Sequence, residues 1–188
     1  MKKQPYKKQP HISAFIGALL AVLALIVPGW ALNLDDAEGW ERSAISRNDN
    51  AIALEEEVVA LLESAVGYRN REYLYDAERR ANLKRAGEAE LRAGELGTAA
   101  AIHYEKATDN WLHAAEVYGT LQNGEQQENA ETMAASARQS ARRALTQAIG
   151  CFESAEEAFG EPNGADERQE RAANEKAKAV RRRLAELL

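Results

Sequence analysis

The chain has 188 residues, of which 45% are hydrophobic and 29% are charged, and its formal net charge is -6. An acidic chain is not typical of nucleic-acid-binding proteins, which need a basic face to neutralise phosphates, and the apolar content is too high for a disordered tail. The single cysteine, Cys151, excludes an intramolecular disulfide and any metal cluster held by several cysteines.

The first 31 residues differ in charge from the rest. Four lysines within residues 1–8 give them +4, which leaves 20 basic and 30 acidic residues, a charge of -10, on residues 32–188. The lysines precede an uncharged apolar run over 12–27, which is the order of a signal peptide. Pro28-Gly29 is expected to end the helix of this run. Small residues at Gly29 and Ala31 then predict a signal peptide over 1–31 with cleavage after Ala31.

An uncleaved membrane anchor over about 12–32 is the alternative. A helix of about 21 residues spans about 32 Å, enough for the roughly 30 Å hydrocarbon core. In both cases the lysines favour the cytoplasmic side. Residues 32–188 are therefore expected to lie outside the cytoplasm, periplasmic or secreted or tethered to the inner membrane, and only the uncleaved N-terminal segment would contact the membrane.

Residues 32–188 are expected to form one all-α domain, because no proline lies between Gly29 and Glu161 and no segment alternates apolar and polar residues as a strand does. About five helices packed as antiparallel hairpins are expected behind the N-terminal segment. Their predicted spans are 33–46, about 51–94, 98–123, 126–159 and 166–183. Turn and cap signals set these limits: Arg47-Asn48-Asp49-Asn50, Gly94, Asn123-Gly124 and the run Gly160-Glu161-Pro162-Asn163-Gly164.

Apolar residues then recur at steps of four and three. In 98–123 they include an aromatic stripe, Tyr104, Trp111 and Tyr118, which is expected to carry much of the packing energy. Small residues repeat in the same way along 126–159, and we call this set the alanine seam. Its members are Ala130, Ala134, Ala137, Ala141, Ala144, Ala148, Cys151, Ala155 and Ala158. Such a seam favours close approach of neighbouring helices.

Part of the chain, residues 82–158, resembles tetratricopeptide repeats. The resemblance rests on Ala86-Gly87, Gly94-Glu95-Leu96, Ala99-Ala100 and Tyr104-Glu105-Lys106-Ala107, followed by Trp111, Ala114, Ala115 and Tyr118 as the opening of a second unit. An offset of 34 residues, the period of this family, aligns Trp111 with Leu145 and Tyr118 with Phe152. The prolines that close the turns of the family are absent between the units. A bundle of long helices therefore stays as an alternative to a repeat superhelix.

The resemblance implies a concave groove that holds a peptide or a partner helix. The groove residues that it implies are Lys84, Glu88, Arg92, Asp109, Leu112 and Glu116.

Candidates for chemistry are few. Cys151 lies on the alanine seam and is expected to be a buried packing residue, while His103 and His113 are expected at the surface or beside the aromatic stripe. The paired Glu-x-x-His motifs of a di-iron bundle are absent from the sequence. We expect no catalytic residue, metal or other cofactor. The sequence favours a non-catalytic interaction or scaffold module of a bacterial-type cell envelope, which binds another envelope protein or itself and no nucleic acid. The alternative is a structural coiled-coil spacer that self-associates through the alanine seam.

Overall fold

The structure is a computed structural model of the whole chain. It describes residues 12–72, 75–160 and 166–188, with side chains from residue 34 onward. The described residues form four α-helices and no strand: α1 (Ile12–Arg69), α2 (Asp76–Thr120), α3 (Gly124–Gly160) and α4 (Glu167–Glu186). The all-α class and the hairpin packing are therefore confirmed, whereas the expectation of five helices is not.

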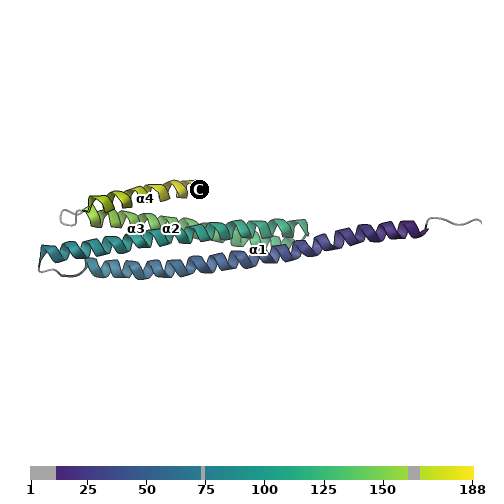
Figure 1. Cartoon of the computed structure of the whole chain (residues 1–188), viewed down its shortest axis with the longest axis horizontal. Coiled ribbons are helices and arrows are strands. Elements are labelled where there is room, and N and C mark those ends of the chain that lie inside the picture. The colour runs from purple at the N-terminus through teal and green to yellow at the C-terminus, as the bar shows by residue number, and fades with distance from the viewer. Residues whose placement is uncertain (1–11, 73–74, 161–165) are drawn as a thin grey trace, which may run out of the picture.

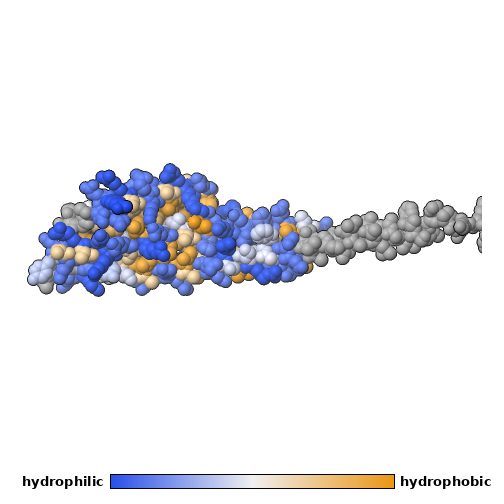
Figure 2. Space-filling view, viewed as in Figure 1, coloured by the Kyte–Doolittle hydropathy of each residue, from blue (hydrophilic) through white to orange (hydrophobic). Residues whose placement is uncertain are grey.

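The four helices lie in chain order across the molecule (Figure 1). Helix α2 packs along both α1 and α3, and α3 also packs against α4. The backbones of α1 and α3 come close to each other at only a few residues. The space-filling view shows a largely hydrophilic face, with apolar patches between hydrophilic ridges over the part of the bundle that carries α4 (Figure 2). The core therefore lies along the contacts of α2 with α1 and α3 and along the contact of α3 with α4.

Small residues from three helices meet in layers along this core. The layers repeat every seven residues, forward along α1 and α3 and backward along α2, as antiparallel packing requires. Four layers have all three members within one hydrophobic cluster: Ala37, Ala114 and Ala130; Ala44, Ala107 and Ala137; Ala51, Ala100 and Ala144; Val58, Ala93 and Cys151. The same spacing leads to Ala65, Ala86 and Ala158, each at most 1% exposed. Small residues at every layer allow the helix axes to approach to about 8 Å.

Glycines in α2 make room for the aromatic rings of α3. A Cβ atom on Gly94 would lie 2.6 Å from Phe152, and one on Gly87 would lie 2.9 Å from Phe159. Both rings are at most 2% exposed and belong to the largest fully buried side chains. The spacing of seven residues is the same for the two glycines and the two rings. Gly94 therefore serves close packing rather than a turn, and α2 continues past it to Thr120.

Two expected helix breaks are wrong. Residues 47–50 lie within α1, because Ala44 and Ala51 on either side belong to successive buried layers and their burial outweighs the turn preference of Asn and Asp. The break at residues 94–98 is replaced by helix for the reason just given. The continuous helix expected over 51–94 is wrong as well, since α1 ends at Arg69 and α2 begins at Asp76. This hairpin lets the small residues of α1 and α2 face each other.

The remaining boundaries follow the sequence more closely. Helix α3 ends at Gly160, and the Asp166 side chain caps α4 by accepting a hydrogen bond from the Gln169 backbone N–H at 3.3 Å. The alanine seam of α3 is buried along its whole length, at most 4% exposed. Between α2 and α3, Gln122 rather than Gly124 has the left-handed backbone, with φ 56°. The Asn123 N–H then donates to the Tyr118 carbonyl at 3.0 Å, which is a Schellman closure of α2.

The N-terminal predictions fall largely outside the described side chains. The signal peptide or anchor, with its cleavage after Ala31, lies among residues 1–33, of which 1–11 are not described at all. The backbone of α1 continues through Pro28-Gly29, so the helix stop expected there is wrong. An interior proline removes one hydrogen-bond donor and can bend a helix without ending it. Within the part of the chain that the structure describes, no helix combines the length and apolarity needed to cross a membrane.

Candidate interaction surface

The one thiol of the chain is buried. Cys151 is 4% exposed and shares a hydrophobic cluster with Val58, Ala93 and Leu96. Burial, and then the charge of Glu90, raises the pKa of the thiol to about 11 from 9.0. A thiol that is protonated and covered at neutral pH is a poor nucleophile. Its location fits the packing role expected from the sequence.

The two histidines of the bundle lie apart along α2. The Trp40 and His113 rings are 5.0 Å apart, and both side chains are exposed at the α1–α2 contact. Burial, then the charges of Arg47 and Lys106, lowers the pKa of His103. Among the described residues, no group of three or more His, Cys, Asp or Glu side chains is arranged to hold a metal ion.

Polar side chains of α1 pair with α2 at intervals of fourteen residues. The Arg69 guanidinium donates from Nε and Nη2 to the two carboxylate oxygens of Glu90, each at 2.9 Å, and from Nη2 to the Ser154 carbonyl at 2.7 Å. The Tyr104 hydroxyl donates to Glu55 at 2.9 Å. The Arg69 pair thereby connects three helices, and its carboxylate is only 6% exposed.

The third pair in this series joins Glu41 of α1 and Tyr118 of α2. Burial, and then the charge and hydrogen bond of Glu41, raises the pKa of Tyr118. From Glu41 to Glu55 to Arg69 the chain advances fourteen residues each time, while the partners on α2 recede by fourteen. Nearly identical alanine layers would tolerate a shift of seven residues, but such a shift would separate all three polar pairs. We therefore infer that these three polar pairs fix the register in which α1 packs against α2.

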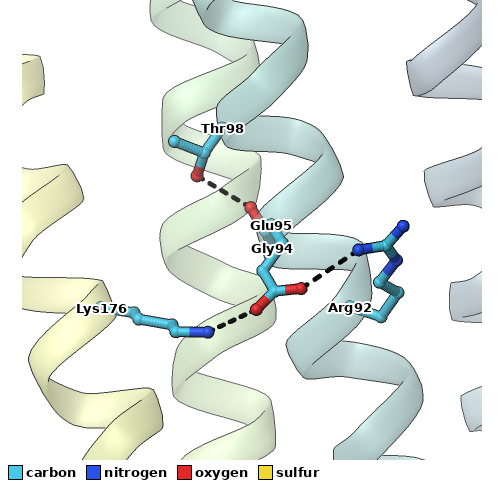
Figure 3. A network of polar contacts seen from close by, with 5 residues as sticks. All are labelled: Arg92, Gly94, Glu95, Thr98 and Lys176. Carbon is cyan, nitrogen blue, oxygen red and sulfur yellow. Dashed lines mark hydrogen bonds and ion pairs between the residues drawn. The ribbon is translucent and has the colours of Figure 1, made fainter.

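Charged contacts also attach α4 to α2. The Glu95 carboxylate of α2 contacts Lys176 of α4 and Arg92 of α2, the latter at 3.4 Å (Figure 3). The hydrogen bond from Lys176 is the main reason that the pKa of Glu95 is lowered. Further along, the Arg183 guanidinium donates to both oxygens of Glu105, at 2.9 and 2.7 Å. These contacts join α4, which packs on α3, to the side of α2 as well.

The aromatic stripe and the predicted groove residues have different locations. Tyr104, Trp111 and Tyr118 are buried, at 4–7% exposure. The six predicted groove residues, Lys84, Glu88, Arg92, Asp109, Leu112 and Glu116, are all exposed on α2. They lie on one uninterrupted helix rather than on two successive repeat helices. Lys84 is 3.6 Å from Asp166 at the start of α4, and Leu112 is the one apolar member, 42% exposed.

A different exposed feature is found on α1, and the sequence analysis missed it. We call it the apolar column: Ile45, Ile52, Val59 and Val66, which are 50%, 43%, 52% and 55% exposed. Each member directly follows a buried layer residue, which is Ala44, Ala51, Val58 or Ala65. Thus α1 buries mostly alanines and exposes larger β-branched residues, the reverse of what hydrophobicity alone would favour. The sequence did contain a signal for this column, because its four β-branched residues lie seven positions apart.

Acidic side chains lie beside the apolar column. Three residues before its last three members are Asp49, Glu56 and Glu63, all exposed. The corresponding residue before Ile45 is Arg42, whose Nη1 is 3.4 Å from Glu38. Among the described residues, no cationic group pairs with Asp49, Glu56 or Glu63. The column is therefore an apolar strip, about 32 Å long at 1.5 Å per residue, with a negatively charged border.

We compared the chain with protein families, curated proteins and solved structures. No family model, no curated protein and no solved structure matches the chain.

Proposed function

We propose that this chain is a non-catalytic interaction module that holds a partner protein along the outer face of α1. The observation that carries the proposal is the apolar column, because an exposed apolar strip bordered by charges is typical of a binding face. The rest of the bundle supplies a rigid support, with layers and polar pairs that fix α1 against α2.

The alternative of a spacer that self-associates through the alanine seam has less support. Every residue of that seam is covered by neighbouring helices of the same chain. Association through the seam would first require α3 to leave α2, at the cost of the buried Phe152 and Phe159 rings. Sedimentation at increasing concentration distinguishes the two hypotheses, since the spacer predicts oligomers that a seam variant such as Ala144→Leu would disrupt.

The proposal includes a location outside the cytoplasm. Its support is the order of four lysines, an apolar run and small residues at Gly29 and Ala31. The first layer residue is Ala37, so cleavage after Ala31 would leave every layer complete. N-terminal sequencing of the protein from its own cells separates a mature chain that starts at Leu32 from one that keeps the segment as an anchor.

Photo-crosslinking in the cells that make the protein tests the binding face. A benzophenone side chain is placed at Ile52, and control positions are Leu112 on α2 and Gln139 on α3. We expect an adduct with another protein at Ile52 and none at Gln139. Equal adduct formation at all three positions, or none at Ile52, would contradict a binding face on α1.

A further inference from the structure

We propose that the partner bound by the apolar column is a single amphipathic helix with Ile, Leu or Val every seven residues and Lys or Arg beside them. This inference rests on the proposed function and names the chemistry of the partner.

The spacing of the column defines the shape of the partner. Side chains seven residues apart lie in one line along a helix only if that helix supercoils with its neighbour. The layers show that α1 already follows this repeat against α2 and α3. The four column residues from Ile45 to Val66 cover three heptads. A second helix with the same repeat could therefore lie along the whole column and place its apolar residues between these four.

The size of the column also favours one helix over a folded domain. Four half-exposed side chains in a line offer far less than the roughly 800 Å² per partner of a standard protein–protein interface. A helix needs only such a strip, with charged residues at its margins.

The charges beside the column select a basic partner. Asp49, Glu56 and Glu63 border it on the outer side, and Glu41 and Glu55 lie on the inner side. Lys or Arg residues at the flanking positions of the bound helix would pair with the outer acids, which have no cation of their own.

The same charges argue against a second copy of the chain. In an antiparallel pair of columns the outer borders would face each other. Asp49 and Glu56 of one copy would then lie opposite acids of the other, and only Arg42, at the end of the border, would face an acid. In a parallel pair the outer acids would face the border that holds Glu41 and Glu55. Like charges at such short range destabilise either arrangement.

Synthetic peptides test the inference with the full chain in a mild nonionic detergent. Two peptides of three heptads share the same Ile and Leu stripe and differ only in Lys or Glu at the flanking positions. Fluorescence anisotropy measures binding of each peptide at 50 and 300 mM salt. We expect the Lys peptide to bind at least 10-fold more tightly than the Glu peptide, with a smaller difference at high salt.

Variants locate the bound peptide. Ile52→Ser with Val59→Ser is expected to weaken binding of the Lys peptide at least 10-fold, and Glu56→Lys with Glu63→Lys is expected to reverse the preference between peptides. Leu112→Ser removes a similarly exposed apolar residue on α2 and is the matched control, expected to bind as the unaltered chain does. Circular dichroism checks that each variant is as helical and as heat-stable as the parent, since all these side chains are exposed.

Three results would overturn the inference: equal binding of both peptides, binding that Ile52→Ser with Val59→Ser leaves unchanged, or a dimer of the chain that these substitutions dissociate. The last would identify a second copy as the occupant. A crosslink at Ile52 in cells to a partner without a basic helix would also refute the named chemistry, while the interaction module itself would stand.

Discussion

Gly94 lies in the middle of α2 against the ring of Phe152, and its replacement by alanine tests how α2 and α3 pack. An added Cβ atom would lie 2.6 Å from ring atom Cε1 and 2.8 Å from both Cδ1 and Cζ. Carbon atoms in van der Waals contact prefer about 3.5–4.0 Å. The ring would therefore have to move by about 1 Å, although Phe152 is only 2% exposed and is enclosed by its neighbours.

Two effects of opposite sign determine how much Gly94→Ala changes the free energy of unfolding. Alanine is better than glycine inside a helix by about 1 kcal/mol. Overpacking of a well-filled core costs about 1–3 kcal/mol, and complete displacement of the ring would approach the roughly 3–5 kcal/mol of a Phe→Ala truncation. The approach of 2.6 Å lies between these two cases, so we take a gross cost of about 2–4 kcal/mol and expect a net loss of about 1–3 kcal/mol. For a domain of this size the loss corresponds to a melting temperature lower by about 2–12 °C.

The measurement is urea or thermal unfolding followed by circular dichroism. Gly150→Ala is the matched control, because Gly150 is exposed inside α3 and a Cβ atom there meets nothing within 4 Å. It should stabilise the chain by up to about 1 kcal/mol. A double variant, Gly94→Ala with Phe152→Leu, should lose less than the sum of its single changes because the smaller side chain leaves room. If Gly94→Ala stabilises the chain as Gly150→Ala does, the proposed contact between Phe152 and the α2 backbone is wrong.

Three further predictions concern buried polar groups and one turn. Arg69→Met leaves the Glu90 carboxylate buried without its partner and should lower the free energy of unfolding by about 3–5 kcal/mol. Adding Glu90→Met should recover much of that loss. Urea unfolding at pH 7 measures both variants, and equal stability of the single and double variants would contradict the pairing. Folding raises the pKa of Cys151 to about 11 from 9.0 and that of Tyr104 to about 12 from 10.0. The contribution of these two groups to stability is therefore complete below pH 9 and is lost as the pH rises toward 12. The melting temperature, measured from pH 8 to 11, should fall less steeply for Cys151→Ala, and a thiol reagent at pH 8 should label Cys151 only after unfolding. Gln122 has a φ of 56°. Gln122→Gly should relieve backbone strain of about 1 kcal/mol, but glycine has a similar entropic cost, so the melting temperature should stay nearly unchanged. Gln122→Val should lower the melting temperature.

The sequence by itself determined that the domain is helical and which residues of α3 face inward. The steps of four and three along residues 130–158 required one buried face, and every member of the alanine seam is buried. Local signals failed where packing opposed them. Gly94 resembled a turn, but its missing side chain accommodates Phe152. The hairpin at residues 70–75 contains neither glycine nor proline, and Asn70 alone is a weak turn signal.

Only the tertiary structure decided which face of α1 is inside. Two columns repeat every seven residues there: 44, 51, 58 and 65, which are small except for Val58, and their neighbours at 45, 52, 59 and 66, which are larger and more apolar. Hydrophobicity alone favours burial of the second column. The structure buries the first, because alanines on α2 and α3 bring the helix axes so close that only small residues fit between them. The larger column is left exposed, and the candidate interaction surface is therefore a consequence of how three helices pack.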